Sequence, residues 1–230
     1  MGSIKKELLS GVFYTAIAKY SGILISLIIT GVLARLISPD KFGIVAVVTV
    51  ITFFFSIFSD LGIGAAIIQN KELQQKDLNQ LFSFTVWSGC ILTLLFFLCS
   101  WPISFFYKEP SMRTITQLLA INLFFASANI VPNALLYKAK AFKFLAWRSL
   151  GVQITGGIIA ILAALGGAGL YALIINPILS SILLFIISYQ KYPQTLEMTW
   201  GIPSIRKIFK FSAYQFMFNI INYFSRNLDK

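Results

Sequence analysis

The residues in this sequence most suited to binding chemistry are polar and charged side chains spaced along apolar runs. In the first run they are Thr15, Lys19, Gly22, Ser26 and Thr30, at steps of four, three, four and four residues. These steps place all of them on one face of a helix. Polar groups in an apolar membrane helix are costly and usually face the bundle interior or a water-filled cavity. The spacing therefore predicts a polar cavity beside this helix.

Three further segments carry polar stripes with the same helical rhythm. Their members are Thr49, Thr52, Ser56, Asp60 and Gly64; Asn122, Ala126, Asn129 and Asn133; and Gln215, Asn219, Asn222, Arg226 and Asp229. Small and hydroxyl residues also let helices pack closely and hydrogen-bond across their interface. We favour that interpretation for the threonines and serines.

Three charged residues in or beside the apolar runs carry separate expectations. Lys19 lies roughly 16 Å inside its run, near the bilayer midplane, at a rise of about 1.5 Å per residue. A cation at that depth is expected to face a cavity and attract anions. Asp60 lies roughly 26 Å along its own helix, nearer the cytoplasmic face, where it either pairs with a basic loop residue or serves transport. Arg35 sits at an outer helix end, where headgroup contact is the simpler account.

The apolar character of the whole chain indicates a membrane protein. Hydrophobic residues make up 57% of the 230 residues, charged residues 12%, and the mean hydropathy is +0.80. A soluble domain averages roughly 25% charged residues. The chain therefore carries more apolar surface than a soluble fold of this size can hide.

Six windows are long and apolar enough to cross a bilayer, which needs roughly 20 residues in a helix. They are Leu9–Leu36, Gly43–Gln69, Leu81–Phe106, Ile115–Tyr137, Leu145–Leu165 and Gly169–Tyr189, and a seventh opens near Phe211. Membrane β-strands would need alternating segments of about ten residues, which the continuous apolar runs contradict. The predicted fold class is therefore all-α, a polytopic membrane bundle.

The distribution of basic residues predicts the orientation. Twelve lie on one side of the predicted spans: Lys5, Lys6, Lys71, Lys76, Lys138, Lys140, Lys143, Arg148, Lys191, Arg206, Lys207 and Lys210. Four lie on the other side: Arg35, Lys41, Lys108 and Arg113. Because cytoplasmic loops are enriched in Lys and Arg, the N-terminus is expected in the cytoplasm. The dispersal of these residues over several loops argues against a nucleic-acid partner.

The residue types needed for a metal site or an enzyme active site are missing or isolated. The chain has no histidine, and Cys90 and Cys99 lie nine residues apart in one predicted span. This leaves no metal-binding spacing. The sequence also has no Walker-type loop, paired carboxylates or nucleophile constellation. We therefore expect no catalysis, no cofactor and no metal.

Several segments, in order along the chain, resemble a known family. The first connection and the run after it contain Leu33–Gly43 (LARLISPDKFG) and Phe58–Gln69 (FSDLGIGAAIIQ). Further matching segments are Phe106–Pro110, Val131–Leu136 and Phe142–Ala146. Together they are similar to the bacterial polysaccharide transport family, which includes the O-antigen flippases. That family lies within the superfamily of multidrug and oligosaccharidyl-lipid exporters.

The resemblance implies a MATE-like architecture of two six-helix lobes around a central cavity. Residues 1–190 are then the N-terminal six-helix lobe, residues 191–207 a cytoplasmic inter-lobe linker, and residues 208–230 the truncated beginning of the second lobe. A faint internal echo agrees, because Ser3–Lys6 (SIKK) recurs as Ser204–Lys207 (SIRK). We expect the chain to be a fragment of a protein about twice as long.

The resemblance also implies a function, translocation of a lipid-linked oligosaccharide or polysaccharide precursor across the bacterial cytoplasmic (inner) membrane by alternating access. Candidates to attract the substrate phosphate are Lys19 and Arg226. Candidates to hydrogen-bond sugar hydroxyls are Asn122, Asn129, Asn133 and Gln153. Arg35 and Asp60 are candidate gating or ion-pair residues. Expected partners are membrane lipids, the missing C-terminal lobe, a glycan polymerase and glycosyltransferases.

Two other functions stay open. A multidrug or cation antiporter of the same superfamily would need an acidic cavity group, and only Asp60 and Asp229 are intramembrane candidates. The charge predicted inside the membrane is mostly basic, which favours the flippase. A non-transporting membrane assembly subunit would have little reason to keep polar stripes on four helices.

Overall fold

The computed structural model describes residues 2–198 and 201–227. In this part of the chain all regular structure is helical, which confirms the predicted all-α class. The helices are α1 (Gly2–Leu36), α2 (Pro39–Asp60), α3 (Ile63–Gln69), α4 (Gln75–Tyr107), α5 (Pro110–Ala128), α6 (Ile130–Lys138), α7 (Phe142–Leu165), a 3₁₀ turn η1 (Gly169–Tyr171), α8 (Ala172–Lys191) and α9 (Ile202–Asn227).

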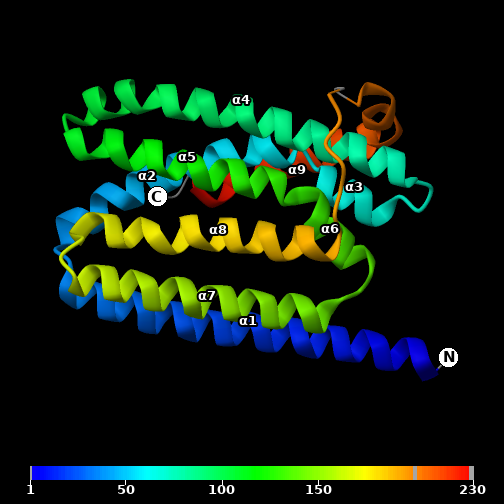
Figure 1. Ribbon diagram of the computed structural model, residues 1–230, viewed down its shortest axis with the longest axis horizontal. Helices are drawn as coiled ribbons and strands as arrows, with labels where there is room; N and C mark the ends of the chain where they lie inside the picture. The colour runs from blue at the N-terminus through cyan, green and yellow to red at the C-terminus, as the bar shows by residue number, and fades with distance from the viewer. Residues whose placement is uncertain (1, 199–200, 228–230) are drawn as a thin grey trace.

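The long helices run side by side as a bundle (Figure 1). Within the described residues, five helices are long and apolar enough to cross a membrane, or six if α5 and α6 form one bent span. The second count agrees with the predicted six. One end of the bundle, here called the N-terminal end, holds the N-terminus, residues 70–74, residues 139–141 and Lys191 (Figure 1). The turns before α2, α5 and α8 lie at the opposite end.

The helix α9 differs from the expected seventh span in two respects. It begins at Ile202, nine residues before Phe211, and it is not among the helices apolar enough to cross a membrane. Its first turns carry Arg206, Lys207 and Lys210, which lower its hydropathy. A seventh span therefore stays a prediction.

Two predicted spans are interrupted. The expected continuous helix Gly43–Gln69 ends at Asp60, because Leu61 and Gly62 adopt left-handed conformations with φ of 44° and 74°. Glycine tolerates this region, whereas a side chain with a Cβ is strained there. The chain restarts as α3. Likewise, α5 and α6 are bent by 40° at Asn129.

Two prolines within the predicted spans, Pro132 and Pro177, occupy different positions in their helices. Pro132 lies in the first turn of α6, where its missing N–H costs no hydrogen bond within the helix. The bend precedes it by a few residues. Pro177 lies inside α8, which continues through it without a break.

Small residues bring α7 close to two neighbouring helices. A Cβ at Gly157 would lie 2.1 Å from Ile29 Cδ1 on α1, and one at Gly156 would lie 2.3 Å from Asn176 Oδ1 on α8. Ala160 and Ala172 are fully buried in the same cluster. These small residues therefore let α7 pack closely against both α1 and α8.

The segment between α8 and α9 is fastened to the first turns of α4 by hydrogen bonds. Gln75 Nε2 donates to Gln194 Oε1 (2.9 Å), the Glu197 N–H donates to Ser83 Oγ (2.7 Å), and Trp87 Nε1 donates to the Glu197 carbonyl (3.2 Å). Because these bonds join residues more than 100 positions apart, they hold the segment against the N-terminal end of the bundle.

Candidate functional site

The two interrupted spans meet at a polar cavity. α3 packs against α6, so the break between α2 and α3 and the bend between α5 and α6 come together. The cavity has a volume of about 270 Å³. Its lining residues are Asp60, Gly64, Ile68, Ala126, Asn129, Ile130, Asn133, Ala134 and Tyr137. Broken membrane helices expose backbone polar groups only where protein or a water-filled cavity surrounds them.

Asp60 contributes the acidic side chain of this cavity. It is the last residue of α2, and the left-handed turn after it directs the carboxylate toward the start of α3. Its Oδ1 accepts a hydrogen bond of 3.3 Å from the Gly64 N–H. The carboxylate thereby satisfies a donor in the first turn of α3 and stabilises the break.

Asn129 sits at the bend between α5 and α6. Its backbone N–H donates to the Phe125 carbonyl at 3.0 Å. Its side-chain Oδ1 is buried and has no hydrogen-bond partner among the described residues. A buried acceptor without a partner costs about 1–3 kcal/mol. Because Asn129 lines the cavity, this unmet acceptor lies beside it.

Asn133 is held by a buried arginine. Arg148 Nη2 donates to Asn133 Oδ1 at 2.9 Å, and Arg148 Nη1 donates to Ser188 Oγ on α8. Arg148 is only 9% exposed. Because the Asn133 oxygen is occupied by the guanidinium, its amide N–H groups are left for the cavity. The arrangement joins α6, α7 and α8.

Arg148 is the residue that sequence reasoning missed. It was counted among the loop residues that set orientation, whereas the structure places it inside the helix bundle. The signal was present in the sequence, since Arg148 falls within the predicted span Leu145–Leu165. A basic residue inside an apolar window should have been given a buried partner.

Four of the other predicted site residues, Lys19, Arg35, Asn122 and Gln153, lie outside this cavity. Lys19 is exposed in the middle of α1, Asn122 is half-buried on α5, and Arg35 is exposed near the end of α1. Gln153 Nε2 donates to the Gly22 carbonyl at 2.8 Å, linking α7 to α1. Arg226 belongs to the last turn of α9, and its side chain lies outside the described part of the structure.

Neither candidate ion-pair residue is paired in the described residues. The ion pair recorded there joins Lys207 Nζ to Asp77 Oδ1 at 2.8 Å, so neither Arg35 nor Asp60 takes part in it. It connects α9 to α4 at the N-terminal end. Sequence reasoning used Lys207 only for the orientation and for the internal echo, and it assigned no role to Asp77.

A second groove collects polar residues from the predicted stripes. It has a volume of about 450 Å³ and lies between α1, α2 and α8. Ser26 and Thr30 on α1, Thr49 on α2 and Asn176 on α8 are among its lining residues. Part of the polar stripe of α1 and one residue of the stripe of α2 therefore line the same groove.

Comparison of the sequence with known proteins identifies a family. The sequence profile of the polysaccharide biosynthesis protein family matches residues 32–230. This chain belongs to that family. The match covers both helix breaks, the cavity and α9. It confirms the resemblance found in the sequence motifs and makes the chain a multi-pass membrane protein of polysaccharide biosynthesis.

Individual members of the polysaccharide biosynthesis family are similar along the chain. Lipopolysaccharide biosynthesis protein WzxC of Escherichia coli (strain K12) is 25% identical, and the alignment covers 98% of this chain and 46% of WzxC. Teichuronic acid biosynthesis protein TuaB of Bacillus subtilis (strain 168) is 25% identical, and the alignment covers 100% of this chain and 48% of TuaB. Succinoglycan biosynthesis transport protein ExoT of Rhizobium meliloti (strain 1021) is 22% identical, and the alignment covers 66% of this chain and 31% of ExoT. The chain spans about half the length of WzxC and TuaB, and no solved structure matches it.

Proposed function

We propose that this chain forms the first lobe of a transporter that moves a lipid-linked oligosaccharide or polysaccharide precursor across the bacterial cytoplasmic membrane. The observation that carries the proposal is the meeting of two broken spans at a polar cavity in a polysaccharide biosynthesis protein. Discontinuous helices recur at the binding sites of transporters, because they present polar groups inside the membrane. The printed name of ExoT includes transport, which supports the same class.

The chemistry of the cavity suits a sugar. Hydroxyl groups both donate and accept hydrogen bonds, so they can satisfy the Asn129 oxygen and the Asp60 carboxylate as donors and the Asn133 amide as an acceptor. Lys19, exposed in the middle of α1, is the candidate to attract the substrate phosphate. Asn122, Gln153 and Arg226 lie elsewhere and stay secondary candidates.

Transport in this proposal uses alternating access between two lobes. The lobe of residues 1–190 rocks against a second lobe that begins after the linker of residues 191–207, with the N-terminus in the cytoplasm. The lipid tail stays in the membrane while the polar head passes between the lobes. Glycan polymerase and glycosyltransferases are the proposed partners on either side of this step.

The proposal is tested by surface-glycan export in a flippase-deficient bacterium. The strain receives this chain completed with a second lobe, or the same protein with Lys19→Ala. We expect the completed protein to restore the surface glycan and the variant to lose most of that activity. Full export by the lysine variant would remove Lys19 from the mechanism, and failure of the completed protein would contradict the flippase assignment.

One observation favours a second candidate, the cation antiporter. The Asp60 carboxylate and the unpartnered Asn129 oxygen line the same cavity, and oxygen ligands of this kind bind hard cations. A completed protein that lowers the cellular accumulation of cationic dyes, and restores no glycan, would establish this alternative.

A further inference from the structure

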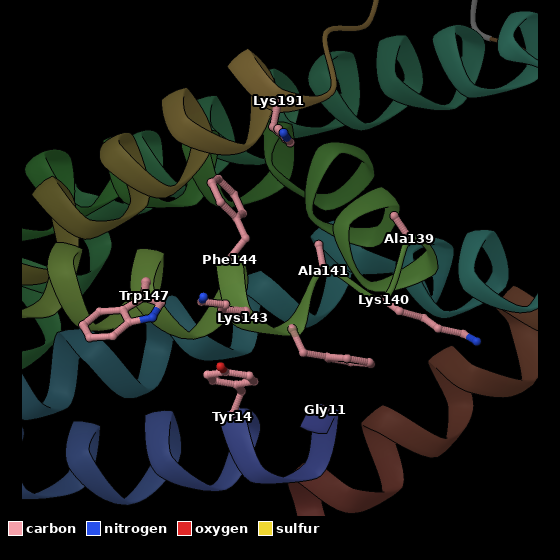
Figure 2. Close-up of a pocket in the computed structure, with 10 residues that line it drawn as sticks. Gly11, Tyr14, Ala139, Lys140, Ala141, Lys143, Phe144, Trp147 and Lys191 are labelled. Carbon is pink, nitrogen blue, oxygen red and sulfur yellow. The ribbon is translucent and has the colours of Figure 1, made fainter. Parts of the chain in front are cut away.

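A large crevice opens at the N-terminal end of the bundle, away from the Asp60 cavity. It has a volume of about 740 Å³ and is formed by α1, the turn before α7, the start of α7 and the end of α8. Figure 2 shows its side chains. Lys143, Tyr14 and Trp147 lie near one another, and Lys191 lies on the other side of Phe144 (Figure 2). Lys140 points away from this group.

The charge of the crevice is entirely positive among its lining residues. Lys140, Lys143 and Lys191 line it, and none of the ten lining residues is acidic. Lys143 and Lys191 come from different helices, α7 and α8, and both line the crevice. Bringing two ammonium groups to one crevice without a carboxylate costs electrostatic energy. An anion that binds there removes this cost.

The start of α7 also lines this crevice, with the Phe142 N–H donating to the Lys140 carbonyl at 2.8 Å. α7 is 24 residues long, and no side chain caps its N-terminus, because Ala141 occupies the cap position. Its first residues, Phe142 to Phe144, line the crevice. The N-terminus of a helix carries backbone N–H groups and a partial positive charge, and both favour an anion, phosphate in particular.

We propose that this crevice binds the phosphate headgroup of an anionic membrane lipid such as cardiolipin. The aromatic side chains beside the lysines favour a membrane lipid over a free anion as the ligand. Trp147 is 67% exposed, and Tyr and Trp concentrate where a bilayer meets water, their rings in the apolar layer and their polar atoms at the headgroups. Basic pockets between membrane helices bind multiply charged headgroups. The site is separate from the transport cavity and does not rest on the proposed function.

The test measures lipid selectivity of the full chain by native mass spectrometry, from detergent containing equal amounts of cardiolipin and phosphatidylcholine. The test variant is Lys143→Gln/Lys191→Gln. The matched control is Lys71→Gln/Lys76→Gln, which removes the same charge from exposed residues at the same end of the bundle. We expect cardiolipin to be retained by the parent chain and the control. The test variant should lose roughly fivefold in retention for each lysine removed.

A second measurement keeps both lysines, so it does not depend on the folding of the double variant. With Trp87, Trp101 and Trp200 changed to Phe, fluorescence from Trp147 reports the crevice alone. Brominated cardiolipin should quench it more strongly than brominated phosphatidylcholine at the same bromine density.

Three results would overturn the proposal. The first is an equal loss of cardiolipin in the Lys71/Lys76 control, which would indicate general surface charge. The second is equal quenching of Trp147 by both brominated lipids. The third is displacement of cardiolipin by millimolar inorganic phosphate, which would identify a site for the free anion.

Discussion

Asn129 lines the Asp60 cavity, and its side-chain oxygen is buried with no hydrogen-bond partner among the described residues. Arg148 donates from its two Nη atoms to Asn133 and Ser188, and its Nε is likewise buried without a partner among the described residues. The side-chain oxygen of Asn129 accepts no hydrogen bond from the described residues, whereas Arg148 joins α6 to α8 through two hydrogen bonds. Binding groups are most effective when supporting hydrogen bonds hold them in place. The two residues should therefore respond differently to substitution.

Asn129→Leu should separate export from stability. Removing the unpartnered oxygen eliminates a cost of about 1–3 kcal/mol, so thermal unfolding in detergent should occur at an equal or higher temperature. Glycan export by the completed protein should fall at least tenfold. Ser127→Ala is the control, because Ser127 is buried on α5 and its hydroxyl donates to the Leu123 carbonyl, outside the cavity. Normal export by Asn129→Leu would contradict the assigned role.

Arg148→Ala should destabilise the fold. The change leaves Asn133 and Ser188 without their donor and opens a space between α7 and α8, and such losses cost roughly 2–4 kcal/mol. The unfolding midpoint measured by circular dichroism should fall by several degrees. Arg148→Lys should recover only part of this loss, because one ammonium cannot reproduce the fork of two nitrogens. An unchanged midpoint in both variants would show that the buried network is unimportant for stability.

At the scale of the elements, the two interruptions have different causes. α2 ends because the backbone turns left-handed at Leu61 and Gly62. α5 and α6 stay close to helical at Asn129, whose φ is −78° and ψ −11°, and the axis bends there. Both breaks lie near the same end of the bundle, so their side chains meet. A cavity of this kind forms only where both interruptions lie at the same height along the bundle axis.

Gly62→Ala should weaken the joint between α2 and α3. The φ of +74° disfavours a Cβ by about 1–2 kcal/mol, and a Cβ there would lie 2.7 Å from the Ser212 carbonyl oxygen on α9. Gly31→Ala is the matched control, since no atom lies within 4 Å of its Cβ position. Thermal unfolding should shift downward for Gly62→Ala only, and equal shifts in the two variants would contradict the special role of the joint.

At the scale of the whole molecule, contacts distant in sequence connect α9 and the segment before it to α4. The Asp77–Lys207 ion pair and the bonds from residues 194–197 to α4 all lie at the N-terminal end. Lys207 is half exposed, with 52% of its side chain accessible, so its pair is partly screened by water. This ion pair and these hydrogen bonds, each weak by itself, help to hold α9 in place.

Lys207→Met should loosen the segment between α8 and α9. The change removes the ion pair and leaves the Gln74–Asp77 capping box of α4 intact. A partly exposed pair contributes roughly 0.5–1 kcal/mol, so hydrogen exchange at the Glu197 amide should be about two- to fivefold faster. Lys210→Met, on the same helix and exposed, should leave this exchange rate unchanged. Equal acceleration by both variants would indicate a charge effect instead of the specific pair.

The sequence alone determined the fold class, most span positions and the family. Apolar content and helical spacing are local properties, and in a membrane they dictate helices because backbone groups have no water to bond. The motifs around Pro39 and Asp60 carried the family resemblance, which the profile match confirms. The sequence also selected three residues of the cavity, Asp60, Asn129 and Asn133, from polar side chains in apolar surroundings.

Only the tertiary structure decided which of the candidate residues come together. Spacing assigns a residue to a helix face, but the neighbour of that face depends on how the helices pack. Asp60 and Asn129 meet because two breaks lie at the same level, whereas Gln153 turns to the Gly22 carbonyl. The buried state of Arg148 follows from acceptors on α6 and α8. These contacts join residues far apart in the chain, so no local pattern in the sequence could specify them.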